Sequence, residues 1–234
     1  MKAMIFAAGL GTRLKPLTDT RPKALVEVAG RTLLEHVVRR LVEAGVTEVV
    51  INLHRLGEQI PPFMEKHGRL GLRRVAYSDE PVLLGTGGGL KQVAWFFDDG
   101  NPFLVHNADV LSMIDLGAMM SAHSRTRALA TLAVMARATT RPLYFDSAGL
   151  LAGRRTKDGR DELVRAPGGA IEPLGFCGIQ AVSPEIFARM SEKGSFGITE
   201  AYLRMAGAGE IIMAHRVDGA KWRDCGRPED LRAL

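Results

Sequence analysis

The chain has 234 residues, 46% of them hydrophobic and 24% charged, and its formal net charge is +5. This composition is normal for a soluble globular protein with a sizeable core, and the length fits a single α/β domain. The positive charge suits anionic ligands but is spread too widely to indicate nucleic-acid binding. Cys177 and Cys225 are too few for a disulfide framework, and no apolar run approaches the ~20 residues that cross a bilayer. We therefore expect a cytoplasmic monomer or homodimer that binds neither membranes nor nucleic acid.

Short apolar segments alternate with helical patterns over the first half of the chain. Continuous apolar runs predict buried strands at 2–8, 47–53, 72–78 and 102–109. Helical patterns lie at 32–45, 57–68, 83–97 and 115–125. The first helix begins with a capping box of Thr32 and Glu35 and ends at Gly45, whereas Pro61 and Pro62 predict that the second is broken. The third follows a glycine loop. This alternation predicts a Rossmann-like, doubly wound, mostly parallel sheet.

The pattern changes after residue 127. Strand-like segments lie at 128–136, 142–146, 149–153, 172–183 and 210–217. Helical segments lie at 184–190, 198–209 and 228–234. The sequence TKDG at 156–159 predicts a turn between two of these strands, and we expect the polar segment 153–169 to be mobile or to act as a lid. Together the patterns predict one α/β domain over 1–234, with a parallel core and a small antiparallel insertion.

The loop after the first strand combines glycines, cations and prolines. Ligands of open α/β sheets bind beyond the carboxyl ends of the strands, so this loop is the expected ligand site. Gly9 and Gly11 let the backbone turn its N–H groups toward phosphate oxygens. Arg13 offers a planar fork for phosphate, and Lys23 offers a compact charge. A plain glycine turn with solvated cations is the alternative, but it does not explain the two prolines that restrict the backbone beside those cations.

Neither common phosphate loop fits this segment. The dinucleotide fingerprint G-x-G-x-x-G fails at Leu14, and no Gly-Lys pair follows the second glycine, as a Walker loop requires. The motif G-x-G-T-R-x-x-P-x-T, followed by P-K, resembles the signature of sugar-1-phosphate nucleotidyltransferases. The sequences GTGGGL at 85–90, HNADVL at 106–111 and WRDCGRPEDL at 222–231 extend this resemblance over nearly the whole chain.

The resemblance implies a fold of the nucleotidyltransferase type, with a nucleotide-binding core at 1–127 and a sugar-phosphate-binding part at 128–234. It implies that Arg13 binds the leaving pyrophosphate portion and that Lys23 contacts phosphate near the reacting centre, so both are the expected catalytic residues. The implied nucleotide-binding residues are Ala7, Ala8, Gly9, Gly11, Thr12, Glu80, Gly85, Gly87 and Gly88. Successive glycines are unfavourable at the start of a helix. The glycines of GTGGG are therefore better explained by close approach of the backbone to a flat base than by a structural role. Glu80 has two open roles, contact with the ligand or support of the glycine loop.

Two carboxylates are the expected Mg²⁺ ligands. Asp109 ends an apolar strand beside the glycine loop, and Mg²⁺ commonly takes one or two carboxylates plus substrate phosphates. An aspartate that caps a turn is the alternative for this residue. The resemblance adds Asp224 as a second ligand, although Cys225 departs from the apolar residue usual at the next position. The sequence leaves the number of metal ions open.

The residues that could face the sugar are Asn107, Glu172, Gly178, Thr199, Glu200 and Trp222. Asn107 lies two residues before Asp109, so both side chains can point to one site. Trp222 is equally typical of a core aromatic residue, and Glu200 of a charge at the start of a helix.

The implied reaction joins a sugar 1-phosphate to a nucleoside triphosphate and gives a nucleotide sugar and pyrophosphate. These two substrates are the expected partners, and Mg²⁺ is the expected cofactor. A phosphate monoester, with its second pKa at about 6, is largely dianionic at neutral pH and needs no general base. The short chain and its TGGG sequence resemble uridylyltransferases that act on N-acetylmuramate 1-phosphate in cell-wall recycling.

That substrate and activity have three alternatives. A heptose or mannose 1-phosphate guanylyltransferase is the nearest, because base choice depends on backbone geometry. A non-catalytic nucleotide-sensing domain would be expected to lose Arg13, Lys23 or Asp109, all of which are present. A dinucleotide-dependent oxidoreductase is disfavoured by Leu14 and by the missing third glycine.

Overall fold

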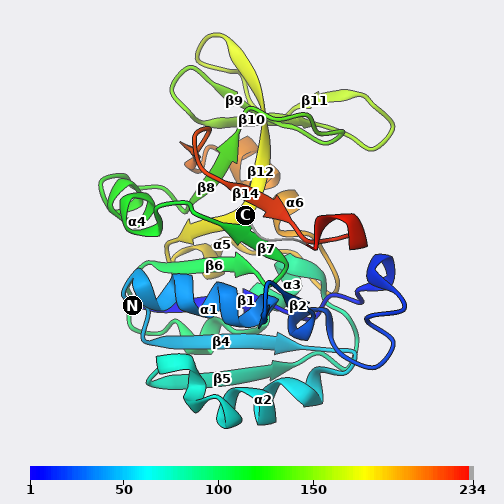
Figure 1. Ribbon diagram of the computed structural model, residues 1–234. Coiled ribbons are helices and arrows are strands. Elements are labelled where there is room, and N and C mark those ends of the chain that lie inside the picture. The colour runs from blue at the N-terminus through cyan, green and yellow to red at the C-terminus, as the bar shows by residue number, and fades with distance from the viewer. Residues whose placement is uncertain (232–234) are drawn as a thin grey trace.

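A central sheet with helices on both faces forms the body of the protein (Figure 1). The computed structural model describes residues 1–231. Four strands are parallel neighbours in the order β5 (Arg74–Asp79), β4 (Glu48–Leu53), β1 (Lys2–Phe6) and β6 (Phe103–Asn107). Each parallel pairing needs a crossover connection, and helices supply most of them. This confirms the predicted doubly wound, mostly parallel arrangement.

The helices divide between the two faces of this sheet. They are α1 (Leu33–Glu43), α2 (Ile60–Lys66), α3 (Gly85–Gln92), α4 (Leu116–Ser124), α5 (Ile186–Arg189) and α6 (Ile198–Gly207). Apolar side chains of α1, α2 and α4 belong to one buried cluster, and those of α3, α5 and α6 belong to another. The predicted capping box of Thr32 and Glu35 is present, and Gly45 ends α1 with a φ of 86°. Both ends of α1 are therefore determined locally, as the sequence predicts.

The second half of the chain extends the sheet beyond β6, mostly through antiparallel pairings. They are β8 (Ala130–Met135), β9 (Leu143–Asp146), β10 (Leu151–Arg155), β11 (Asp161–Leu163), β12 (Ile171–Val182) and β13 (Ile212–Arg216). The long strand β12 pairs antiparallel with β6, β8 and β9, whereas β13 runs parallel to β8. In Figure 1, β9, β10 and β11 project above the body of the sheet. The predicted TKDG turn joins β10 to β11 in an antiparallel hairpin, which makes up the first part of the polar segment 153–169.

Small elements complete the fold. Two short antiparallel pairs are β2 (Glu27–Val28) with β3 (Arg31–Thr32), and β7 (Val110–Ser112) with β14 (Trp222–Asp224). The 3₁₀ helices are Thr12–Leu14, Lys23–Leu25, Gly57–Gln59, Gly68–Gly71, Ala94–Phe96 and Pro228–Asp230. The β7–β14 pair brings the predicted segment 222–231 back beside the end of β6 (Figure 1).

Two predicted helices differ in the structure. Pro61 and Pro62 lie together in the first turn of α2, where a missing N–H leaves no hydrogen bond unmade, and a 3₁₀ turn precedes them. The helix predicted at 228–234 is a short 3₁₀ turn, Pro228–Asp230, and residues 232–234 lie outside the described part of the chain. Among the described residues, no helix is both long and apolar enough to cross a membrane.

The predicted glycine loop at 85–89 is wrong, because these glycines form the first turns of α3. Close packing explains why a helix keeps them. A Cβ added at Gly87 would lie 2.2 Å from the Phe196 ring, and one at Gly88 would lie 2.7 Å from the Gly194 carbonyl oxygen. The Gly87 N–H also donates to the Phe196 carbonyl at 2.9 Å. These contacts lock α3 against the segment before α6.

Gly88→Ala is expected to lower the free energy of unfolding by about 1–3 kcal/mol, because the added methyl group meets backbone that cannot swing away. In an unobstructed helix the same change stabilises by about 1 kcal/mol. Gly219→Ala is the matched control, since nothing lies within 4 Å of a Cβ added there. Urea unfolding of both variants measures the difference, and a stabilised Gly88→Ala protein would contradict the packing argument.

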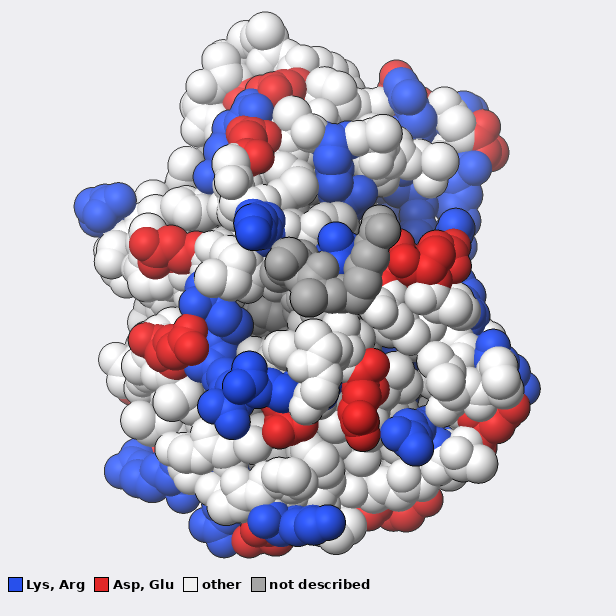
Figure 2. Space-filling model, in the orientation of Figure 1, with Lys and Arg blue, Asp and Glu red and all other residues white. Residues whose placement is uncertain are grey.

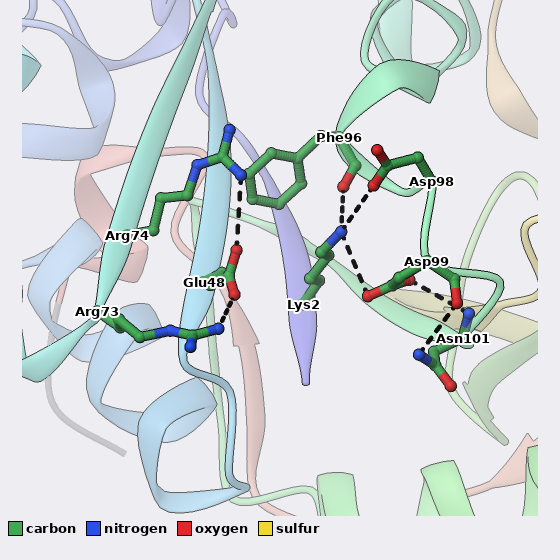
Figure 3. A network of polar contacts seen from close by, with 8 residues as sticks. All are labelled: Lys2, Glu48, Arg73, Arg74, Phe96, Asp98, Asp99 and Asn101. Carbon is green, nitrogen blue, oxygen red and sulfur yellow. Dashed lines mark hydrogen bonds and ion pairs between the residues drawn. The ribbon is translucent and has the colours of Figure 1, made fainter.

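Ion pairs and hydrogen bonds link the amino ends of neighbouring parallel strands (Figure 3). Lys2, at the start of β1, pairs with Asp98 at 3.1 Å and with Asp99 at 3.2 Å. Glu48, at the start of β4, pairs with Arg73. All these groups lie at the amino ends of the parallel strands, so they tie neighbouring strands together and leave the carboxyl ends open for ligands.

Candidate active site

Two overlapping cavities lie at the carboxyl ends of β1, β4 and β6, and a third lies beside the projecting hairpin. The central cavity, about 260 Å³, lies between the loop after β1 and the start of α3. The glycine-loop cavity, about 290 Å³, lies beside Gly9–Arg13 and shares Lys23 and Asp109 with the central cavity. The hairpin cavity, about 580 Å³, lies beneath β10 and the turn that follows it and reaches Asp224.

Most of the predicted site residues line one of these cavities. In the central cavity they are Ala7, Ala8, Gly9, Lys23, Glu80, Gly85, Asn107 and Asp109. In the glycine-loop cavity they also include Gly11, Thr12 and Arg13. In the hairpin cavity they are Thr199, Glu200 and Asp224. The fold thus brings residues from both halves of the chain close together, since Asp224 and Arg13 both lie beside Gly226.

A buried polar network fixes the walls of the central cavity. Asn52, only 3% exposed, accepts hydrogen bonds from the backbone N–H groups of Ala7 at 2.7 Å and Ala8 at 3.4 Å. Its amide nitrogen donates to Glu80 at 2.7 Å, and the other Glu80 oxygen accepts from the Leu84 N–H at 2.9 Å. Both carboxylate oxygens of Glu80 are therefore used within the protein, which favours the supporting role over ligand contact.

The loop after β1 is held in one shape by its own residues. Gly11 has a φ of 65°, and the Thr18 hydroxyl donates to the Gly11 carbonyl at 2.8 Å. A Cβ at Gly11 would lie 2.9 Å from Thr18, and the buried Leu14 anchors the following turn in the core. Only glycine fits position 11, because both the left-handed backbone and the close contact exclude a side chain.

The four cations of this loop have different surroundings. Arg13 and Lys23 line the glycine-loop cavity. Lys15 and Arg21 line none of the three cavities and lie at 3.5 Å from Asp19 and 4.0 Å from Glu27, in largely exposed pairs. The structure therefore separates two cations that face the cleft from two that face solvent.

Two carboxylates meet these cations at the mouth of the cleft. Asp109 forms an ion pair with Lys23, whose side chain is only 11% exposed. Asp224 lies at the end of β14, and a Cβ at Gly226 would lie 2.8 Å from its Oδ1 and 2.9 Å from Arg13 Nη2. Partial burial and the nearby Asp109 carboxylate raise the pKa of Asp224, against the opposing effect of Lys23 and Arg13. The four charged groups therefore form one interacting set.

These carboxylates fit a Mg²⁺ site. Asp109 lies in the turn between β6 and β7, and Asp224 ends β14. The pairing of Asp224 with Val110, and the hydrogen bond from the Cys225 N–H to the Asp109 carbonyl at 2.8 Å, bring the two residues side by side. No group of three or more His, Cys, Asp or Glu side chains suited to a metal occurs among residues 1–231. A two-carboxylate set leaves coordination positions for phosphate and water, which is the usual Mg²⁺ arrangement.

The residues predicted to face the sugar are placed differently from one another. Gly178, in a bulge of β12 with a φ of 74°, makes room for Asn107, since a Cβ there would lie 2.7 Å from the Asn107 amide nitrogen. The Trp222 indole N–H donates to the Cys177 carbonyl at 2.8 Å, so its polar edge is used within the fold. Glu172 lies on an exposed stretch of β12 and pairs with Arg216, apart from the three cavities.

A comparison with protein families agrees with this geometry. The family described as nucleotidyl transferase matches residues 2–145, which carry the glycine loop, α3 and Asp109. The chain belongs to the nucleotidyl transferase family. The predicted family resemblance and enzyme class are thereby confirmed.

Named relatives in this family share much of the sequence. The chain is 36% identical to an N-acetylmuramate alpha-1-phosphate uridylyltransferase of Caulobacter vibrioides over 216 residues, covering 89% of this chain and 86% of the relative. It is 49% identical over 119 residues to the enzyme of that name from Neisseria meningitidis, with 50% and 51% covered. A mannose-1-phosphate guanylyltransferase catalytic subunit beta of Dictyostelium discoideum is 28% identical and matches 99% of this chain, which spans 62% of that relative.

Solved structures of low sequence identity have the same fold. A UDP-glucose pyrophosphorylase complexed with UDP-glucose has a TM-score of 0.76 at 21% identity and covers 98% of this chain and 95% of its own. HddC from Yersinia pseudotuberculosis complexed with GMP-PN has a TM-score of 0.73 at 21% identity, with 98% and 96% covered. These similarities confirm the predicted α/β architecture.

Three residues important for the nucleotidyl transferase site were missed from the sequence. Asn52 interrupts an otherwise apolar strand, and that lone polar residue was the available signal. Gly226 lies within the segment 222–231, but its closeness to Arg13 depends on the β7–β14 pairing. Arg137 lies in the hairpin cavity and gave no local signal, because its position depends on contacts with Gly175 and Trp222.

Asp224→Asn is expected to raise the stability of the protein at neutral pH while it lowers activity. Because the pKa of Asp224 is raised on folding, the folded state favours the protonated carboxyl, and its ionised form opposes folding. The variant should therefore melt at a higher temperature than the wild type near neutral pH. This difference should shrink as the pH falls toward about 3.9, where the unfolded carboxyl also takes up a proton. A variant that melts lower at neutral pH contradicts this assignment.

Proposed function

We propose that this chain transfers a uridylyl group from UTP to N-acetylmuramate 1-phosphate and releases pyrophosphate. The observation that carries the proposal is the group of four charged residues, Lys23, Asp109, Arg13 and Asp224, which gather where two anionic substrates would meet. The identity of the two substrates is supported by the Caulobacter vibrioides relative, 36% identical over 216 residues. Such a reaction would belong to peptidoglycan recycling in the cytoplasm.

The central and glycine-loop cavities suit a nucleoside triphosphate. The central cavity is walled by the backbone of Ala7–Gly9 and by the start of α3, so a flat base can lie against main-chain groups. The triphosphate would then extend along Gly9–Arg13, where the Arg13 guanidinium faces the β- and γ-phosphates. Lys23 lies between the two cavities, in position to contact the α-phosphate.

The chemical step needs positioning more than proton transfer. A phosphate oxygen of the sugar 1-phosphate attacks the α-phosphorus, a new P–O bond forms, and the bond from that phosphorus to the bridging oxygen breaks. The bond electrons leave with pyrophosphate. The attacking phosphate is largely dianionic with a second pKa at about 6, so no side chain must remove a proton. Arg13 and Lys23 stabilise the charge that gathers on the leaving group and on the α-phosphate.

Asp109 and Asp224 would hold Mg²⁺, which supplies Lewis-acid neutralisation of phosphate charge. In the protein itself, Lys23 holds Asp109 in place through their ion pair. Gly226 keeps the space between Asp224 and Arg13 free of a side chain. These residues set the positions of two mutually repelling phosphates before reaction.

A substrate panel tests the proposal. Pyrophosphate release is measured for each of UTP, GTP, CTP, dTTP and ATP with N-acetylmuramate, N-acetylglucosamine, mannose and heptose 1-phosphates, with and without Mg²⁺. The fastest reaction should be that of UTP with N-acetylmuramate 1-phosphate, and it should require Mg²⁺. A preference for GTP with mannose or heptose 1-phosphate would instead favour the guanylyltransferase alternative. No pyrophosphate release with any pair would contradict a transferase activity and favour the nucleotide-sensing alternative.

A further inference from the structure

The charged residues that line the hairpin cavity are mostly cationic. Its cationic lining residues are Arg137, Arg141, Arg154, Arg155 and Lys157. Its acidic lining residues are Glu200 and Asp224, of which Asp224 belongs to the candidate metal site. In Figure 2, lysine and arginine side chains gather at the right of the molecule, between the projecting hairpin and the body of the sheet.

Only part of this charge is neutralised by the chain. Arg154 pairs with Glu162 at 3.0 Å, and Arg155 pairs with Asp161 at 2.8 Å, across the β10–β11 hairpin. Among residues 1–231, no ion pair joins Arg137, Arg141 or Lys157 to a carboxylate. Three cations therefore face a cavity of about 580 Å³ that also reaches Asp224.

Arg137 is the cation that the fold holds most firmly. Its guanidinium lies over the Trp222 ring, 4.5 Å from the ring centroid, and Nη2 donates to the Phe176 carbonyl at 2.9 Å. Gly175 supplies the space, because a Cβ there would lie 2.6 Å from Arg137 Nε and 2.7 Å from its Cγ. Nε is buried without a hydrogen-bond partner in the described structure. Such a fixed cation is pre-organised to receive an anion, since little side-chain entropy remains to be lost.

We infer that the hairpin cavity is a second anion site, in which Arg137, assisted by Arg141 and Lys157, binds a carboxylate on the sugar. This inference rests on the proposed function and specifies the substrate class as sugar 1-phosphates that carry a carboxylate. In N-acetylmuramate 1-phosphate that group is the lactyl ether, which is all that distinguishes it from N-acetylglucosamine 1-phosphate. The 1-phosphate faces Asp109 and Asp224, and the carboxylate reaches the arginines.

This arrangement would give selectivity as well as affinity. A neutral sugar leaves Arg137 without an anion in a partly desolvated pocket, whereas a carboxylate completes a charge-assisted hydrogen bond. Trp222, predicted from the sequence to face the sugar, instead supports Arg137 with its ring in this arrangement. Arg137 and Trp222 are thus a specificity-determining residue and its positioning residue.

The test compares two sugar phosphates in three variants. For wild type, Arg137→Met, Gly175→Ala and the control Arg160→Met, kcat and KM are measured with N-acetylmuramate 1-phosphate and with N-acetylglucosamine 1-phosphate. Arg160 lies on the same hairpin but pairs with Asp158 and does not line the cavity. Isothermal titration calorimetry of both sugar phosphates gives the same comparison without turnover, and thermal unfolding shows that each variant is folded.

Arg137→Met is expected to raise the KM for the acidic substrate about tenfold to a hundredfold, with little change in kcat or in the KM for the neutral one. Gly175→Ala keeps the charge but displaces the guanidinium, so it should weaken the same preference to a smaller extent, and Arg160→Met should preserve it. A folded Arg137→Met protein with the wild-type preference would overturn the inference, as would a wild type that prefers the neutral sugar. Glucuronate 1-phosphate is measured as a second acidic sugar, and a wild type that prefers it would refute N-acetylmuramate as substrate but support the anion site.

Discussion

Asp109→Asn is expected to lower kcat/KM about a thousandfold while the protein remains folded. The substitution keeps the shape of the side chain but removes the charge that pairs with Lys23 and that would hold Mg²⁺. Without that charge, Lys23 loses the partner that sets its position between the central and glycine-loop cavities. The loss should appear mainly in kcat, because positioning of the two phosphates matters most in the transition state.

The control for this variant is Asp19→Asn, in the same loop region but paired only with exposed Lys15 at 3.5 Å. It should keep near-normal kinetics. Steady-state rates over a range of Mg²⁺ concentrations, together with thermal unfolding, separate a chemical loss from a folding defect. A folded Asp109→Asn enzyme within about tenfold of the wild-type rate would show that Asp109 lies outside the reacting centre.

Arg13→Ala is expected to lower kcat about a hundredfold to a thousandfold, because the guanidinium stabilises charge on the departing pyrophosphate. Arg13→Lys should recover only part of the rate, since an ammonium group cannot reproduce the two-pronged contact with phosphate oxygens. The fold should be unaffected, because Arg13 is an exposed residue on a loop that Gly11, Leu14 and Thr18 hold in place.

Arg21→Ala is the matched control for Arg13. Both arginines belong to the same cationic loop, but Arg21 lies 4.0 Å from Glu27 and lines none of the three cavities. Equal losses in the two variants would mean that the loop acts through its total charge, against the specific role of Arg13. A large loss confined to Arg13 supports the placement of the leaving group along Gly9–Arg13.

The sequence predicts best those features that depend on local patterns. The parallel strands follow from short apolar runs, and α1 follows from its capping box and Gly45. The place of the loop after β1 beside a cavity is also predictable, because its glycines and cations lie close together in sequence. Gly11 adopts the left-handed backbone that favours glycine. The roles of these loop residues in catalysis stay predictions until the variants are measured.

Features that depend on contacts between distant segments could not be predicted. The glycines at 87–89 indicate a loop by helix propensity, yet Phe196, Gly194 and Glu80 pack so closely that only glycine fits the helix. The supporting role of Glu80 depends on its contact with Asn52, which belongs to β4 and is distant in sequence. In the same way, Arg137 has no motif of its own, and its position results from β12 and β14 meeting in space.

The division into a nucleotide-binding core and a sugar-phosphate-binding part is still a prediction. The lining of the three cavities shows which residues it would assign to each substrate. Residues before 128 supply the central and glycine-loop cavities almost entirely, apart from Gly226. The hairpin cavity is lined by residues after that point. If the division is right, variants in the first group should alter the kinetics of the nucleotide, and Arg137 variants those of the sugar.

The most direct test is a crystal structure of the protein with a non-hydrolysable UTP analogue, N-acetylmuramate 1-phosphate and Mg²⁺. The account predicts the triphosphate along Gly9–Arg13, with metal density between Asp109 and Asp224 and the sugar carboxylate beside Arg137. A triphosphate bound away from the loop after β1 would contradict the central claim that this cleft brings the two phosphates together.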